Sequence, residues 1–88
     1  MSDFAVPRVE LDTMSIEAAA IDRVPADAAR RYQVVPVAVL SDSVLIVAMS
    51  DPTNLKAVDD LFFLSRLRIE PVLASAGAIK RALAKYYP

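Results

Sequence analysis

The sequence contains no cysteine, no histidine and a single glycine among its 88 residues. Without cysteine or histidine, the chain cannot form a disulfide, a thiolate or imidazole metal site, a cysteine nucleophile or a Ser-His-Asp triad. One glycine is too few for the phosphate-binding loop or for the dinucleotide-binding fingerprint. These absences argue against a catalytic role. They predict that the chain is not an enzyme and carries no metal or other cofactor.

Charge and hydropathy narrow the class of protein further. The net charge is -1, whereas a general nucleic-acid binder needs a positive field. The longest apolar run, Val44–Met49, is far too short to cross a bilayer, and no basic, apolar signal peptide is visible. We therefore expect a soluble, cytoplasmic protein that binds no nucleic acid and does not insert directly into a membrane.

The basic residues are concentrated toward the C-terminus. Residues 1–60 are rich in carboxylates, whereas residues 61–88 contain five Lys or Arg side chains and a single carboxylate, Glu70. Two explanations stay open. Basic side chains near helix C-termini oppose the negative end of the helix dipole, and a cluster of them can also form a contact face for an acidic partner.

The N-terminal residues have an extended pattern. Apolar and polar residues alternate over residues 9–12, which suits an extended arm or a short edge strand. We interpret residues 1–12 as an extended N-terminal arm and residues 13–88 as one domain.

Two short helices are predicted next. Thr13 or Ser15 could cap the first helix, in which Ile16 and Ala20 would face inward. The second helix, Pro25–Tyr32, begins with a proline, which suits the first helical position and interrupts the helix before it.

Two apolar segments separated by a Ser-Asp-Ser turn predict a β-hairpin. Val34–Leu40 is rich in β-branched residues, and Pro36 near its start is tolerated on an edge strand. Val44–Met49 is apolar at every position, which predicts a central strand covered on both faces.

A helix and a third strand should follow the hairpin. Asp51 and Pro52 suit the N-cap and first residue of a helix over residues 53–65. Residues 68–74 have strand character, and Pro71 places them at an edge or a bulge. The predicted buried stripe of the helix comprises Leu55, Val58, Leu61, Phe62 and Ser65.

Ser75 is expected to cap a last helix. Its predicted buried stripe ends at Tyr86, while Tyr87 is expected to cover the edge of the domain. The other members of that stripe are Ile79, Ala82 and Leu83. The whole pattern predicts an α+β fold, in which a small three-stranded mixed sheet, made of a hairpin plus a crossover strand, is covered by about four short helices.

An ordered series of short motifs runs through about three-quarters of the chain. The motifs are Ala29-Arg30-Arg31-Tyr32 in the Pro-led helix, Val35-Pro36, Val47-Ala48-Met49, Asp51-Pro52-Thr53-Asn54, Asp59-Asp60-Leu61, Pro71-Val72-Leu73-Ala74 and Tyr86-Tyr87. This series resembles the N-terminal domain of the type II secretion and type IV pilus assembly ATPases, the GspE/PilB/MshE type.

The resemblance implies a non-catalytic protein-interaction domain that docks a motor domain to other parts of a bacterial protein-transport or pilus machine. The expected partners are the cytoplasmic part of an inner-membrane platform protein and a motor ATPase domain. The chain would then reach the inner membrane only through a protein. The glycine-rich phosphate loop of the motor is absent, so ATP hydrolysis does not carry over to this chain.

One branch of the resembling family binds cyclic di-GMP through a longer N-terminal motif that begins Arg-Leu-Gly, contains a second glycine and ends in Gln. This chain has no glycine before Gly77, and its only glutamine, Gln33, lies in another context. Because one branch of the family binds this nucleotide, a cyclic di-GMP receptor is the alternative prediction. Because the motif is absent, we rank it below protein docking. The family also favours glycine at the helix-to-strand turn where this chain has Arg66, so either Arg66 takes a strained left-handed backbone or the turn has another shape.

Six basic residues are the predicted partner-binding residues, because Arg can form paired hydrogen bonds to carboxylates across an interface. They are Arg66, Arg68, Lys80 and Arg81 and a second group, Arg30 and Arg31. Lys85 is a further basic residue near the first group. No catalytic, cofactor-binding or metal-binding residue is predicted. The adjacent carboxylates Asp59 and Asp60 point about 100° apart on a helix and do not converge.

Overall fold

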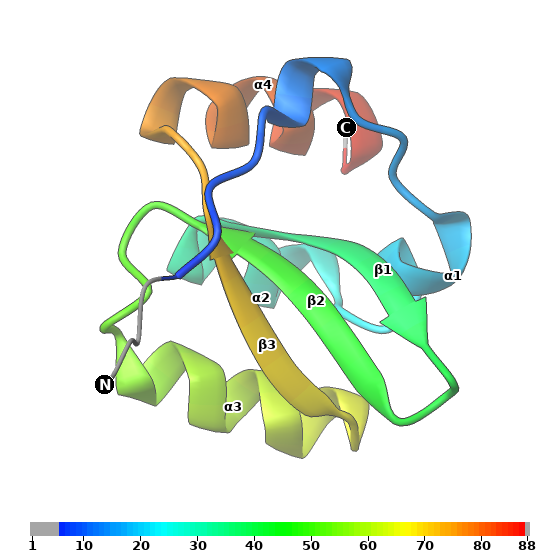
Figure 1. Ribbon diagram of the computed structural model, residues 1–88. Helices are drawn as coiled ribbons and strands as arrows, with labels where there is room; N and C mark the ends of the chain where they lie inside the picture. The colour runs from blue at the N-terminus through cyan, green and yellow to red at the C-terminus, as the bar shows by residue number, and fades with distance from the viewer. Residues whose placement is uncertain (1–5, 88) are drawn as a thin grey trace.

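The most apolar strand lies at the centre of the sheet. The computed structural model describes residues 6–87, in which β1 (Val34–Leu40), β2 (Val44–Met49) and β3 (Arg68–Leu73) are ordered β1-β2-β3. β1 pairs with β2 antiparallel, and β2 pairs with β3 parallel (Figure 1). The predicted α+β fold, with its hairpin, crossover strand and central position for β2, is confirmed.

Both strand prolines lie on edge strands, as expected. Pro36 is in β1, next to a register shift between Pro36 and Ala38, and Pro71 is in β3 opposite Val47. Proline lacks the amide hydrogen that a central strand must donate on one of its sides. The two prolines are therefore compatible with the outer strands but would break the hydrogen-bond ladder in β2.

The helices cover both faces of the sheet. α3 lies on one side of the sheet and α4 on the other, and the arm and a 3₁₀ turn pass beside α4 (Figure 1). The helical elements are η1 (Leu11–Thr13), α1 (Ala18–Ile21), α2 (Ala26–Tyr32), α3 (Leu55–Ser65) and α4 (Ala76–Tyr86).

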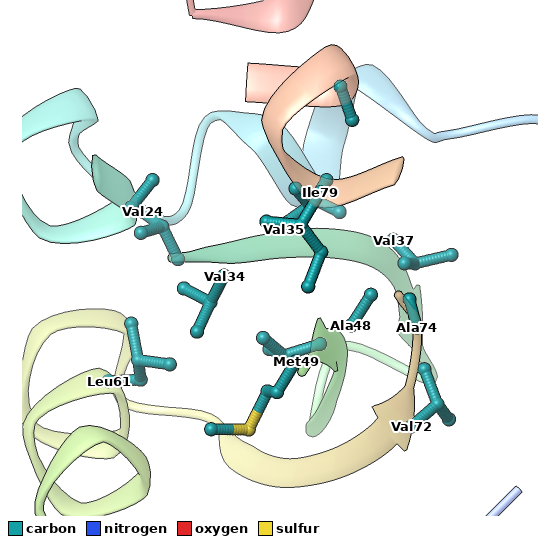
Figure 2. Packing of buried hydrophobic residues seen from close by; sticks show 14 of the residues in the cluster. Val24, Val34, Val35, Val37, Ala48, Met49, Leu61, Val72, Ala74 and Ile79 are labelled. Carbon is teal, nitrogen blue, oxygen red and sulfur yellow. The ribbon is translucent and has the colours of Figure 1, made fainter. Parts of the chain in front are cut away.

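The core is continuous across the sheet because successive strand residues point to opposite faces. Leu61 of α3 lies on the side of Val34 and Met49, and Ile79 of α4 lies beside Val35 on the opposite side (Figure 2). The fully buried large side chains are Val24, Val34, Val35, Pro36, Leu45, Val47, Met49, Leu61 and Ile79.

The first helix is shorter than predicted. It begins at Ala18 instead of directly after Thr13 or Ser15, and Ile16 precedes it. Glu17 has extended backbone angles, its amide donates to the carbonyl of Val37 over 3.0 Å, and its side-chain Oε1 accepts from the amide of Val39 over 3.1 Å. The edge of β1 thus holds residue 17 in a non-helical conformation.

The start of α3 is also different from the prediction. Asn54, not Asp51, is the N-cap, and its side chain accepts from the amide of Ala57 over 3.2 Å. Asp51 instead accepts from the amide and hydroxyl of Thr53, so it closes the turn before the helix. Both carboxylate and amide side chains are good caps, and the amide of Asn54, three residues after Asp51, caps the helix.

The buried face of α3 is the largest error of the sequence-based prediction. Ala57, Leu61 and Ser65, spaced four residues apart, face the sheet. Leu55 and Phe62, which were predicted to be buried, are 71% and 54% exposed. The small side chains of Ala57 and Ser65 let the helix backbone approach the sheet closely, and this turns the larger apolar side chains outward.

The arm continues the sheet for a short distance. The amide of Val9 donates to the carbonyl of Leu73 over 2.8 Å, and the amide of Leu73 donates to the carbonyl of Pro7 over 2.7 Å. The arm therefore occupies the outer edge of β3 at one point. Its first five residues lie outside the described part of the chain, and the domain boundary at residue 12 stays a prediction.

Replacing Leu61 by alanine should lower the free energy of unfolding by about 2–5 kcal/mol, because the fully buried side chain leaves a cavity between α3 and the sheet. Leu55→Ala, on the same helix but 71% exposed, is the matched control and should change stability by less than about 0.5 kcal/mol. Urea denaturation followed by circular dichroism measures both. Equal losses in the two variants would show that the buried face of α3 is assigned wrongly.

Candidate protein-docking surfaces

A shallow hollow of about 470 Å³ lies between α2 and α4. It brings together Arg30 and Lys80, two of the predicted partner-binding residues that are far apart in the sequence. The guanidinium of Arg30 donates to the backbone carbonyl of Tyr87, which holds it at the rim. The remaining lining residues are Gln33, Leu83, Ala84 and Tyr87.

Tyr87 is the buried tyrosine at the end of α4, and Tyr86 is only half-buried, which reverses the predicted roles of the two residues. The Tyr87 hydroxyl donates to the carbonyl of Val24 at 2.9 Å and lies 3.0 Å from that of Ile21. Burial, with a smaller effect of the Asp22 charge, raises the pKa of Tyr87 to about 12. Tyr87 thus ties the end of α4 to the loop between α1 and α2.

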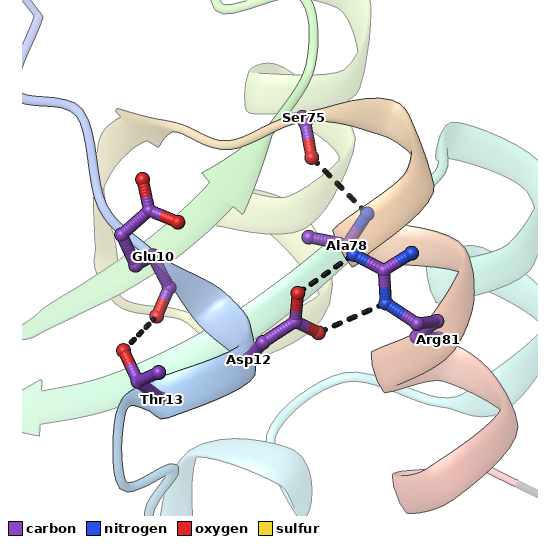
Figure 3. A network of polar contacts seen from close by, with 6 residues as sticks. All are labelled: Glu10, Asp12, Thr13, Ser75, Ala78 and Arg81. Atoms are coloured by element: carbon purple, nitrogen blue, oxygen red, sulfur yellow. Dashed lines mark hydrogen bonds and ion pairs between the residues drawn. The ribbon is translucent and has the colours of Figure 1, made fainter.

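Arg81 is already paired within the domain. Its Nε donates to Oδ1 of Asp12 over 3.0 Å and its Nη2 to Oδ2 over 2.6 Å, as Figure 3 shows. The hydrogen bonds from Arg81 hold the pKa of the Asp12 carboxyl below its ordinary value. This paired contact joins the 3₁₀ turn to α4, so the hydrogen-bonding edge of Arg81 faces Asp12.

Arg66 and Arg68 lie at the turn from α3 to β3. Arg66 is the C-cap of α3 with a left-handed backbone, at φ 64° and ψ 20°. Its guanidinium lies 6.0 Å from the centre of the Phe63 ring. The Nε of Arg68 is 3.4 Å from Oε2 of Glu70, and both of these side chains are largely exposed. Of the two alternatives for this turn, the left-handed one is present, with arginine in the place of glycine.

The six predicted residues do not form one continuous surface. Arg66 and Arg68 follow α3, whereas Lys80 and Arg81 lie on α4, on the opposite side of the sheet (Figure 1). Arg31 is exposed on α2. Their separation means that a single partner helix or loop cannot contact all of them, and each group must be tested by itself.

Sequence reasoning missed an exposed apolar surface on α3. Leu55, Phe62, Phe63 and Leu64 are 71%, 54%, 73% and 49% exposed, and they are four of the five large apolar side chains with high exposure in the described chain. A signal was available, because three large apolar residues in consecutive helical positions cannot all face one side of a helix. Exposed large apolar side chains that gather on one element mark an interaction surface.

Within residues 6–87 no group of three acidic side chains could hold a metal ion, and no helix there is long and apolar enough to cross a membrane.

Asp60 accepts a hydrogen bond from the Tyr32 hydroxyl, which raises the pKa of Tyr32. This contact joins α2 to α3, and it accounts structurally for one of the two adjacent carboxylates.

The fold and the motifs together define a family. The family model described as the MshEN domain matches residues 4–88, and the chain belongs to this family. Over 84 residues it is 44% identical to the type IV pilus assembly ATPase PilB of Myxococcus xanthus, and over 85 residues it is 28% identical to PilB of Acinetobacter baylyi. The predicted resemblance to the N-terminal domain of secretion and pilus ATPases is confirmed.

Two solved structures share the fold. The structure of MshE with cyclic di-GMP matches with a TM-score of 0.84 and 28% identity, over 93% of this chain and 59% of that one. The N-terminal domain of XpsE matches with a TM-score of 0.78 and 15% identity, over 93% of this chain and 57% of that one. The chain spans only 15% of the length of the Myxococcus PilB and 14% of the Acinetobacter PilB.

Replacing Tyr87 by phenylalanine should lower the free energy of unfolding by about 1–3 kcal/mol, because the carbonyl of Val24 loses its donor. The loss should also depend on pH. The pKa of Tyr87 in the folded state is about 12, above the ordinary value of 10. The protonated hydroxyl therefore contributes its full stabilisation below pH 10, and this contribution is lost as the pH rises through 12.

Urea denaturation of both proteins at pH 8 and pH 11 tests this pH dependence. The difference in stability between wild type and Tyr87→Phe should shrink by about 1 kcal/mol at pH 11. Tyr32 is present in both proteins, so its own titration cancels. A difference that is the same at both pH values would show that the Tyr87 hydroxyl does not titrate as described.

Proposed function

We propose that this chain is a non-catalytic docking domain of a pilus or secretion ATPase, in which the domain joins the motor to another protein of the machine. The observation that carries the proposal is the 44% identity to the part of a type IV pilus assembly ATPase that this chain spans. A domain covering 15% of such a protein, with a packed aliphatic core, acts through its outer surface.

The physical character of that surface supports protein binding. The hollow between α2 and α4 is shallow and lined by Leu83, Ala84 and Tyr87 beside Arg30 and Lys80. α3 adds an exposed apolar surface that ends in arginine. Interfaces between proteins are enriched in aromatic side chains and arginine, whereas a small-molecule site is an enclosed cavity with converging polar groups.

The proposed partners are the cytoplasmic part of an inner-membrane platform protein and the motor domain of the ATPase. The proposed location is the cytoplasm, with contact to the inner membrane only through that protein. The net charge of -1 gives no field for nucleic acid.

Charge reversal should weaken capture of the partner. Affinity capture from the cytoplasmic and membrane fractions of the producing cell compares wild type with Arg66→Glu, Arg68→Glu and Arg81→Glu, and we expect a loss of about 3- to 10-fold for a variant at the interface. Arg23→Glu, at an exposed arginine outside the six, is the control. Arg81→Glu also loses the pair with Asp12, so its thermal stability must be measured alongside. Unchanged capture by all three variants would remove these residues from the interface.

A cyclic di-GMP receptor is the second candidate, and the structure of MshE with this nucleotide favours it. The glycine motif expected for nucleotide binding is absent from this chain, whose one glycine is Gly77. Isothermal titration calorimetry of the chain with cyclic di-GMP should therefore give no binding heat. Binding with a micromolar or lower Kd would place nucleotide sensing above docking.

A further inference from the structure

The exposed side of α3 carries an acidic group, two aromatic rings and a basic group, in that order along the chain. Asp59 and Arg66 are both exposed and are seven residues apart, so they lie on the same side of the helix, separated by about 10 Å. Phe62 and Phe63, which are 54% and 73% exposed, lie midway between them. We call these four residues the α3 patch. Its apolar centre thus has charges of opposite sign at equal distances on its two sides.

Neither charge of the α3 patch is neutralised within the described chain. The ion pairs among residues 6–87 are formed by other side chains, so Asp59 and Arg66 pair neither with one another nor with a third group. The guanidinium of Arg66 lies 6.0 Å from the centre of the Phe63 ring, next to the apolar centre of the patch. Both charges therefore favour a partner outside residues 6–87.

The α3 patch is complementary to a second copy of itself. When two α3 helices pack antiparallel about a two-fold axis between Phe62 and Phe63, Asp59 of each copy faces Arg66 of the other. The aromatic rings then meet at the axis, and identical ion pairs flank them, each about 5 Å from the axis along the helix. A partner of another sequence would need the same order of charges, whereas a second copy supplies it. A parallel arrangement would instead bring the two Arg66 side chains together, and like charges repel.

The hydrogen bonds of Asp51 favour this register over a shifted one. A shift of about one helical turn would set Arg66 of one copy against Asp51 of the other. Asp51, however, already accepts from the amide and the hydroxyl of Thr53. The shift would also move Phe63, the most exposed of the large apolar side chains, away from the axis. The register with Asp59 opposite Arg66 therefore uses the unpaired carboxylate and covers both rings.

The other charges of α3 are compatible with this pairing. Asp60 accepts a hydrogen bond from the Tyr32 hydroxyl and is therefore directed toward α2. Lys56 lies three residues before Asp59 and is about 5 Å farther from the axis, so Asp59 is the nearer of the two to Arg66 of the second copy. The acidic and basic groups of the two patches therefore balance where the helices touch.

Association through the strand edges has less room. The arm is hydrogen-bonded to Leu73 on the outer side of β3, and Glu17 is hydrogen-bonded to Val37 on the outer side of β1. Each free strand edge is therefore partly occupied by the chain itself, which disfavours the addition of a strand at these points. Self-association is accordingly expected at a helix.

We propose that two copies of the chain associate antiparallel through the α3 patch, with Phe62 and Phe63 at the two-fold axis and Asp59 of each copy paired with Arg66 of the other. This inference goes beyond the docking function and does not depend on it. The 11-residue helix is about 16 Å long, which is short beside the about 1,200 Å² of a stable interface. We therefore expect weak, reversible association, with a Kd of about 0.1–1 mM.

Sedimentation equilibrium of the chain between about 0.05 and 2 mM, which brackets the expected Kd, tests the proposal. The apparent mass of the wild type should rise with concentration from 9.6 kDa toward twice that value. Asp59→Arg and Arg66→Asp should each raise the Kd at least 5-fold, because each variant brings like charges together. The double variant exchanges the two charges and should recover the wild-type Kd within about 2-fold.

The matched control for these variants is Arg31→Asp, which makes the same change of charge at an exposed position on α2 and should leave the Kd unchanged. Aspartate is tolerated in the left-handed conformation of residue 66, and circular dichroism verifies that each variant is folded.

The absence of cysteine from the sequence allows the register to be tested by disulfide formation. Position 62 lies beside its counterpart across the axis, whereas position 55 lies roughly 20 Å along the helix from its own counterpart. Under mild oxidation at about 1 mM, the upper end of the expected Kd range, Phe62→Cys should form disulfide-linked dimers and Leu55→Cys should form few. A parallel pair of helices would link at both positions.

Three outcomes would overturn the pairing and leave the docking function intact. They are equal linking of the two cysteine variants, a double charge variant that does not recover association, and a wild-type chain that stays monomeric at about 2 mM, above the expected Kd. In the last case, loss of partner capture by Arg66→Glu would show that the α3 patch contacts another protein instead.

Discussion

Strand β2 must be shielded from water on both of its faces, and the rest of the structure follows from that requirement. Its residues alternate between a side that packs under α3 and a side that packs under α4, with Leu45, Val47 and Met49 buried on the first side and Ala48 on the other. If helices covered only one face of the sheet, about half of the apolar side chains of this strand would be exposed to water. The helices that follow β2 and β3 therefore lie on opposite sides of the sheet.

This two-sided cover also divides the outer surface. Arg66 and the apolar side chains of α3 belong to one side, and Lys80 and Arg81 belong to the other. The two sides differ in chemistry as well. The Arg81 guanidinium is paired with Asp12 within the domain, whereas the rings of Phe62 and Phe63 lie open to solvent. The two sides of the sheet therefore present two separate surfaces of different chemistry.

The sequence predicts the elements well where periodicity and turn chemistry agree. All three strands and the central position of β2 could be predicted from β-branched runs, prolines and turn residues. The face of α3 could not, because the apolar residues of that helix occupy more than one side. Tertiary packing selects Ala57, Leu61 and Ser65 for closeness to the sheet, and local spacing carries no information on that choice. The predicted roles of Tyr86 and Tyr87 were reversed for the same reason, because adjacent tyrosines at a helix end have similar local sequence environments.

The position of Tyr87 has a mechanical consequence. Its hydroxyl lies within hydrogen-bond distance of the backbone of Ile21 and Val24, and Arg30 donates to the carbonyl of Tyr87 itself. A tensile force applied to the chain at this residue therefore acts on the loop between α1 and α2 and on α2 as well as on α4. These hydrogen bonds must break before the end of α4 can be pulled away from the helices beside it.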